Sequence, residues 1–79
     1  MNISSLIVYT RSGDTDAVCH SLDAFEGVEV HARAPDGRLI ATMETADPAA
    51  STRLYESIER TTGVVSVALV YQHNEAFQE

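Results

Sequence analysis

The residues of this chain that could hold a metal are one cysteine and three histidines, and their spacing argues against a shared site. Cys19 stands alone, and His20, His31 and His73 fall in different segments with no CxxC or HxxxH spacing. Zinc sites draw on closely spaced pairs of such residues. We therefore expect no metal and no cofactor, with Cys19 as a buried, inert core residue. His31 is read as an exposed strand residue rather than as a ligand or a pH switch.

Nucleophilic catalysis and phosphate binding find little support either. Ser4, Ser5 and Ser66 fall on predicted strands, with no histidine at a fixed spacing from any of them. Arg11 lies in the loop TRSGD, the place where acylphosphatases hold phosphate. That loop has a single glycine, so the glycine-rich signature of a phosphate loop is missing. The sequence therefore predicts that the chain is not an enzyme.

The charge balance narrows the class of partner. The 79 residues carry a net charge of -7, with five arginines and no lysine. Nucleic acids and anionic membranes are bound mainly through cationic side chains, so this balance repels both. We expect no nucleic acid partner and no insertion into the membrane, and a cationic partner suits the chain better.

The compartment follows from the cysteine count and the first residues. One cysteine cannot form an intramolecular disulfide, and a lone thiol suits a reducing compartment. The start MNISSLIVYT lacks the basic residues and the apolar core of an export signal. No apolar run approaches the roughly 20 residues of a membrane span. These features predict a soluble, cytoplasmic protein.

Hydrophobic periodicity predicts six elements within a single domain that spans residues 1–79. Period-2 alternation marks the strands, and a 3.6-residue period with capping and turn signals marks the helices. In chain order we expect a strand at 3–10, a helix at 14–24, strands at 28–33 and 38–44, a helix between Asp47 and Gly63, a strand at 63–72, and a polar tail at about 72–79.

This order of elements is typical of the split βαβ, or ferredoxin-like, α+β fold. Right-handed crossovers place both helices on one face of a four-stranded antiparallel sheet. We expect the first and fourth strands to lie side by side as the two central strands. The other face of the sheet then has no helix to cover it.

The helix-free face is the candidate binding surface, and alternation along the strands predicts which side chains reach it. A bulge after Gly63 should turn Val64, Val67, Leu69 and Tyr71 toward the helices. In the second strand we expect Val28, Val30 and Ala32 to face the helices as well, and Glu29, His31 and Arg33 to face away from them. The helix-free face then presents Ile7, Tyr9, Ile40, Thr42, Ser66, Ala68, Val70 and Gln72, with Glu29, His31, Glu44 and the tail at its rim.

An apolar patch on an uncovered sheet face is open to three interpretations. Contiguous exposed apolar residues often mark a partner site. A weak homodimer would cover the same residues. Scattered apolar residues are also normal on protein surfaces and need no partner.

Four segments of the chain follow the pattern of one protein family. They are ISSLIV at 3–8, LDAFEGVEVH at 22–31, GRLIATME at 37–44 and IERTTGVVSVALVYQHNE at 58–75. The most telling are a Leu-x-x-Phe-x-Gly-x-Glu-Val run from Leu22 to Val30 and a Gly-Val-x-x-Val-x-Leu-Val-Tyr run from Gly63 to Tyr71. Together, in this order and at this chain length, they resemble the NapD family, the small cytoplasmic chaperones of the periplasmic nitrate reductase.

The resemblance implies a chaperone without a cofactor of its own. Members of the family bind the twin-arginine signal peptide of the nitrate reductase catalytic subunit and delay export through the Tat translocase until cofactor loading is complete. In that role the peptide-binding residues are expected to be Ile7, Tyr9, Ile40, Thr42, Ser66, Ala68 and Val70. Acidic residues at the rim, namely Glu29, Glu44 and Glu75, are expected to pair with the arginines.

Two other functions fit the same topology. A regulatory module of the ACT type binds small molecules, usually as a dimer fused to an enzyme, but this chain is free-standing and has no glycine-rich ligand loop. A metallochaperone would need a cysteine pair, and the chain has only Cys19.

Overall fold

The structure is a computed structural model that describes the fold of residues 2–74 and the side chains of residues 2–72. The element order is the predicted one. The elements are β1 (Asn2–Thr10), α1 (Thr15–Asp23), β2 (Val28–Arg33), β3 (Arg38–Thr45), α2 (Pro48–Glu59) and β4 (Val64–Asn74). β4 continues past residue 72, where a tail was expected to begin, because the first residues of β1 extend the ladder to Asn2 opposite Asn74.

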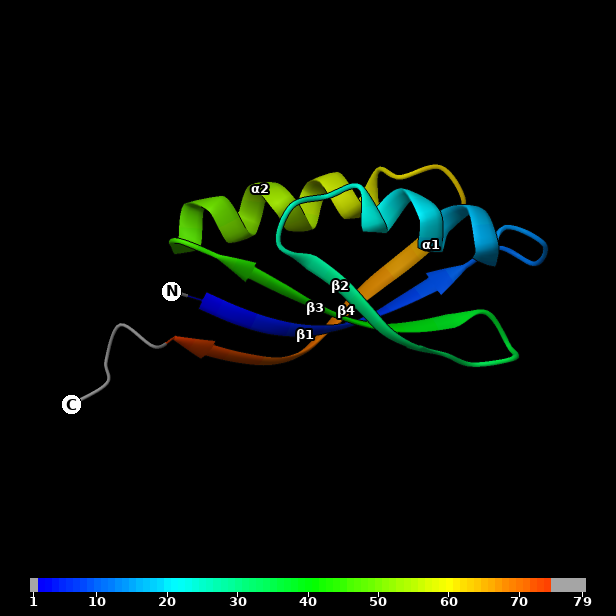
Figure 1. Cartoon of the computed structure of the whole chain (residues 1–79), viewed down its shortest axis with the longest axis horizontal. Coiled ribbons are helices and arrows are strands. Elements are labelled where there is room, and N and C mark those ends of the chain that lie inside the picture. Colours follow the sequence, from blue (N-terminus) through cyan, green and yellow to red (C-terminus); the bar gives the residue numbers. More distant parts are fainter. Residues whose placement is uncertain (1, 75–79) are drawn as a thin grey trace.

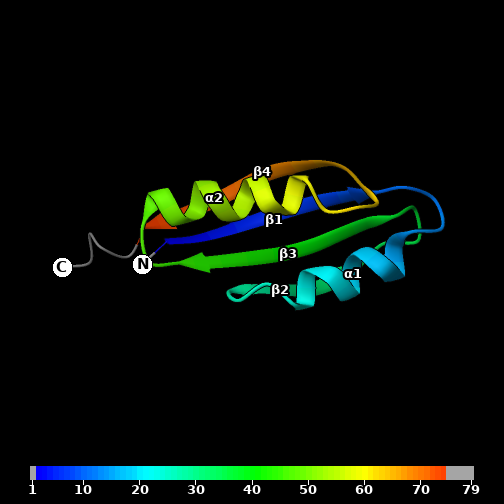
Figure 2. The same ribbon diagram turned by 90° about the horizontal axis from the view of Figure 1, so that it is seen from above.

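Both helices lie on the same face of an antiparallel sheet, as expected for the ferredoxin-like α+β fold (Figure 1). Seen from above, α2 runs along β1 and β4, while α1 lies beside β2 and β3 (Figure 2). The N-cap residue Asp47 fixes the start of α2, since its side chain accepts a hydrogen bond from the amide of Ala50 at 2.8 Å and Pro48 follows it.

The strand order β2-β3-β1-β4 corrects one expectation about the sheet. β1 and β4 are neighbours, as predicted, but the two central strands are β1 and β3, and β4 is an edge strand. The reason is that the connection through α1 does not place β2 directly beside β1 but leaves room for one strand between them. β3 then fills that position and pairs with β1 from Asn2 opposite Thr45 to Tyr9 opposite Arg38.

The hydrophobic core lies between the helices and the sheet. Its fully or almost fully buried members are Leu6, Val8, Val18, Leu22, Leu39, Met43 and Ile58. Alternate residues of β1 and β3 face this layer, so the residues between them face the side without helices. Cys19 of α1 was expected to be a buried core residue, but it is only half-buried, at the margin of the core.

Two bulges in β4 decide which of its side chains face the helices. The predicted bulge at the start of the strand is present at Val65, and it places Val64 opposite Thr10 on the helix side. A second bulge at Val70 was not predicted. Beyond it the alternation is reversed, because an extra residue shifts every later side chain to the other face.

Because of the second bulge, the predicted faces of two side chains were wrong. Tyr71 was expected to face the helices, but it lies opposite Ser5 on the helix-free side. Gln72 was expected on the helix-free side, but it lies opposite Ser4, which is fully buried on the helix side of β1.

A similar bulge at His31 reverses the alternation at the end of β2, so the predicted orientation of two side chains was wrong there. Ala32 was expected to face the helices and Arg33 to face away from them. Ala32 instead lies opposite Ile40 on the helix-free side, and Arg33 lies opposite Leu39 on the helix side. There the Arg33 guanidinium forms an ion pair with Asp16 of α1. The hydrogen bond to Asp16 and the negative charge of that carboxylate raise the pKa of Arg33 above its usual value.

Candidate functional site

The helix-free side of the sheet, called the open face below, carries an apolar row that crosses all four strands. Ala32 lies opposite Ile40, Ile40 lies opposite Ile7, and Ile7 lies opposite Ala68. Side chains paired in this way have Cβ atoms about 4.5 to 5.5 Å apart. Ile40 is 39% exposed although it sits on a central strand. The row is therefore contiguous apolar surface in the middle of the sheet, and neither helix covers it.

Polar and aromatic side chains flank this row. Toward the end of β1, Tyr9 lies between Arg38 and Ser66 and is 37% exposed. On the other side, Ser5 lies opposite Thr42, and the Thr42 hydroxyl is 2.8 Å from Nε2 of His31. This hydrogen bond holds the imidazole ring of His31, on the edge strand β2, against the neighbouring strand β3.

The structure brings most of the predicted peptide-binding residues together on the open face. By strand register the residues that share this face are Ile7, Tyr9, Ile40, Thr42, Ser66 and Ala68. Val70 is the extra residue of the second bulge, has no partner across the strand and is 55% exposed. The sequence reasoning missed Ala32 and Tyr71, which the two unpredicted bulges turn to this side.

The two described acidic residues of the predicted rim lie at one end of the open face. Glu29 is opposite Thr42, and Glu44 is opposite Ile3 at the start of β1. Both side chains are exposed. Glu75, the third residue expected in this role, lies outside the described residues.

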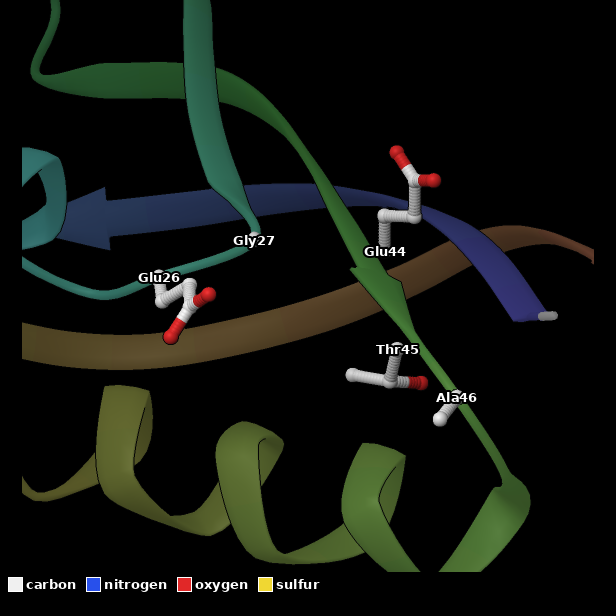
Figure 3. Close-up of a pocket in the computed structure, with 5 residues that line it drawn as sticks. All are labelled: Glu26, Gly27, Glu44, Thr45 and Ala46. Atoms are coloured by element: carbon white, nitrogen blue, oxygen red, sulfur yellow. The ribbon is translucent and has the colours of Figure 1, made fainter.

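Two hollows adjoin each other at this acidic end. One has a volume of about 480 Å³ and is lined by Glu26, Gly27, Glu44, Thr45 and Ala46 (Figure 3). The other has a volume of about 430 Å³ and is lined by Ile3, Gly27, Val28, Glu29, His31, Thr42 and Glu44. They share Gly27 and Glu44, and each has a second glutamate of its own. Sequence reasoning did not single out Glu26, which lies in the turn before β2.

Gly27 makes the close approach at the centre of the acidic end possible. Its carbonyl accepts a hydrogen bond from the amide of Glu44 at 2.8 Å, and its φ is +90°. A Cβ at this position would lie 2.5 Å from the carbonyl oxygen of Glu44. Figure 3 shows the Glu44 carboxylate pointing away from α2, while Glu26 projects on the α2 side of Gly27.

The opposite end of the open face carries an arginine. Arg38 lies opposite Tyr9, and its Nε atom is 3.0 Å from the Asp36 carboxylate in the turn between β2 and β3. The hydrogen bond from Arg38 lowers the pKa of Asp36. The open face therefore runs from a carboxylate end at Glu29 and Glu44 to an end that carries a guanidinium.

Other candidate chemistry is not assembled among residues 2–74. In this part of the chain no group of three or more histidine, cysteine, aspartate or glutamate side chains is placed to hold a metal. Ser4 is fully buried, and Arg11 forms an ion pair with Asp14 at 3.4 Å. Among the described residues no helix is long and apolar enough to cross a membrane.

These features define a small α+β protein of the ferredoxin-like class with an uncovered, partly apolar sheet face. The family model for the NapD protein matches residues 1–76. The chain therefore belongs to the NapD family.

Individual relatives agree with this assignment. Chaperone NapD of Escherichia coli K12 is 35% identical over 74 residues, which cover 92% of this chain and 85% of that protein. Chaperone NapD of Shigella flexneri matches to the same extent. The solution structure of the E. coli Tat proofreading chaperone protein NapD superposes with a TM-score of 0.83 at 33% identity, covering 98% of this chain and 82% of that one.

Proposed function

We propose that this chain is a cytoplasmic maturation chaperone without catalytic activity. It binds the twin-arginine signal peptide of the periplasmic nitrate reductase catalytic subunit and delays Tat export until cofactor loading is complete. Its membership of the NapD family supports this function. The structural observation that carries the proposal is the apolar row of the open face, which leads to a carboxylate end.

The apolar row supplies the surface for the apolar stretch of the peptide. Ile7 and Ile40 form the middle of the row, and the small side chains of Ala32 and Ala68 keep its two ends low. Covering such surface contributes roughly 25 cal/mol per Å² before the costs of association. A shallow apolar floor of this kind accepts many apolar sequences, so specificity has to come from the charged end.

The carboxylate end supplies the pairing for the two arginines. Glu29 and Glu44 take the guanidinium groups, and Glu26 adds a third carboxylate to the hollow beside Gly27. Guanidinium and carboxylate groups form strong, charge-assisted hydrogen bonds, often in pairs. At the far end of the face the Asp36 carboxylate is already paired with Arg38, so the arginines find their partners at Glu29 and Glu44 instead. The peptide therefore lies with its arginines at Glu44 and its apolar stretch toward Tyr9.

Titration calorimetry with three peptides tests this function. They are the twin-arginine signal peptide, the same peptide with both arginines replaced by lysine, and a peptide whose apolar stretch is replaced by serine and glycine. We expect binding of the first, weaker binding of the second and loss of binding for the third. A ligand-binding regulatory module would instead bind a free amino acid from a panel and ignore all three peptides, and that outcome would overturn the proposal.

A further inference from the structure

His31 lies at the same end of the open face as the carboxylates proposed to pair with the arginines. It lines the hollow of about 430 Å³ together with Glu29 and Glu44. The side chains of all three residues are exposed to solvent. The imidazole ring therefore borders the space in which Glu29 and Glu44 would receive the guanidinium groups of a twin-arginine peptide.

A bulge in β2 and one hydrogen bond place the ring there. The bulge lies between Val30 and Ala32, so His31 has no partner across the strand. Its Nε2 atom is 2.8 Å from the hydroxyl oxygen of Thr42. Thr42 is also the residue opposite Glu29 in the strand register. The imidazole and the Glu29 side chain thus lie beside the same residue of β3, on the open face.

The charged groups that border the ring on the open face are carboxylates. Glu29 comes from the same strand as His31, and Glu44 comes from β3. β1 contributes the uncharged Ile3 to this hollow. His73 of β4 lies opposite Ile3 in the strand register, and its side chain is outside the described residues. In the described part of the chain neither Glu29 nor Glu44 forms an ion pair, so both can receive a cation.

The other charged groups near this end are paired elsewhere or negative. Arg33 of β2 lies on the helix side, where it pairs with Asp16 of α1. Arg38 of β3 lies at the far end of the open face and pairs with a carboxylate there. Glu26, in the turn before β2, lines the adjoining hollow and adds negative charge to the acidic end. Among the described residues that line the two hollows, His31 is the one that can carry a positive charge.

We propose that His31 is a further residue of the arginine-binding end, and that a proton on its imidazole competes with the arginines of the peptide for Glu29 and Glu44. This inference rests on the proposed function. A neutral imidazole leaves both carboxylates to the guanidinium groups. An imidazolium instead places a positive charge beside them and donates hydrogen bonds from both ring nitrogens. From the sequence His31 was expected to be an exposed residue and not a pH switch, and its surroundings in the structure argue for this second role.

The competition links the affinity for the peptide to pH. Histidine side chains of model peptides change charge at about pH 6.5 and glutamate side chains at about pH 4.3, so between about pH 7.5 and about pH 5.5 it is the imidazole whose charge changes. Because the neutral form binds, the peptide should bind about tenfold more weakly at the lower pH than at the higher. Binding at the lower pH should also release about one proton per peptide into the buffer, and almost none at the higher pH.

Titration calorimetry with the twin-arginine peptide at both pH values tests the competition, and two buffers of different ionisation enthalpy count the protons released. His31→Gln keeps a neutral, hydrogen-bonding side chain that does not titrate, so it should bind equally well at both pH values and release no proton. His31→Lys carries a permanent positive charge, so at both pH values it should bind as weakly as the unmodified chain does at the lower pH. The same two changes at His20, an exposed residue of α1, are the matched controls and should behave like the unmodified chain.

Three outcomes would overturn the role of His31 and leave the proposed chaperone function untouched. One is equal binding of the peptide to the unmodified chain at both pH values. Another is a pH dependence that persists in His31→Gln, which would assign the proton to a different group, such as His73. The third is equal binding by His31→Lys and His20→Lys. Absence of peptide binding to the unmodified chain at the higher pH would instead overturn the proposed function and this inference together. Circular dichroism at both pH values shows that the variants are folded.

Discussion

Ile7 of β1 lies directly opposite Ala68 of β4, and this pair faces away from both helices. On its other side Ile7 has Ile40 of β3 as its partner. A bulky side chain on the central strand thus stands beside a small one on the edge strand. The step between them is a place on the open face where an apolar segment can pack against Ile7 from the β4 side.

Ala68→Arg should abolish binding of the twin-arginine peptide and leave the chain folded. The new side chain fills the space beside Ile7 and places a positive charge next to a positively charged ligand. Ala68 faces away from the core, so the midpoint of thermal unfolding should change little. Calorimetry and a thermal melt measure the two effects. Ala17→Arg, an exposed position on α1, is the matched control and should bind normally.

If Ala68→Arg still binds the peptide, the site lies elsewhere than on the open face. Loss of folding in this variant would instead mean that Ala68 faces the helices.

Glu29→Gln combined with Glu44→Gln should weaken binding of the peptide and remove most of its salt dependence. The change keeps the shape of both side chains and removes the two charges expected to pair with arginine. Exposed charges are screened beyond about 8 Å at an ionic strength near 0.15 M. Calorimetry at low and high salt compares the double variant with Glu59→Gln on α2, where the same change should have no effect. Equal salt dependence of binding in the unmodified chain, the double variant and Glu59→Gln would contradict the assigned role of the carboxylates.

The element order and most of the open face could be predicted from the sequence because they depend on local signals. The alternation of β1 and β3, the Asp47-Pro48 helix start and the bulge that follows Gly63 can each be predicted from a few adjacent residues. Ile7, Tyr9, Ile40 and Thr42 were therefore placed correctly.

The errors come from features that have no local signal. The bulges at His31 and Val70 occur in β-branched and polar runs without glycine or proline, so the apparent alternation continues through them. Because neither bulge was predicted, two neighbouring residues of each strand were assigned to the wrong face. The edge position of β4 depends on which strand pairs with the far side of β1, and that is a property of the whole topology.

Gly27→Ala should destabilise the chain more than Gly13→Ala does. Both glycines have a φ near +90°, which costs an L-residue roughly 1–2 kcal/mol. At Gly27 the added Cβ would also lie 2.5 Å from the Glu44 carbonyl, whereas at Gly13 it meets nothing within 4 Å. Denaturant unfolding of the two variants isolates the effect of the contact. Equal losses would mean that the turn at Gly27 can move away from β3, and that the two adjoining hollows are not fixed in shape.

Ser4→Ala should leave the stability of the chain unchanged or raise it by about 1 kcal/mol. The Ser4 side chain is fully buried on the helix side of β1, between Met43 and Gln72 in the strand register. Its hydroxyl has no hydrogen-bond partner among the described residues. A buried polar group without a partner costs about 1–3 kcal/mol of desolvation, which alanine does not incur.

Ser51→Ala, at a similarly buried serine of α2, is the contrasting variant. The Ser51 hydroxyl is hydrogen-bonded to the Thr45 hydroxyl, and its removal leaves Thr45 without this partner. A loss of about 0.5–1.5 kcal/mol is expected. In a domain of this size 1 kcal/mol shifts the midpoint of thermal unfolding by about 4–8 °C, so melts of the two variants should move in opposite directions or differ clearly. A loss of stability in Ser4→Ala equal to that in Ser51→Ala would show that the Ser4 hydroxyl makes a stabilising hydrogen bond in solution.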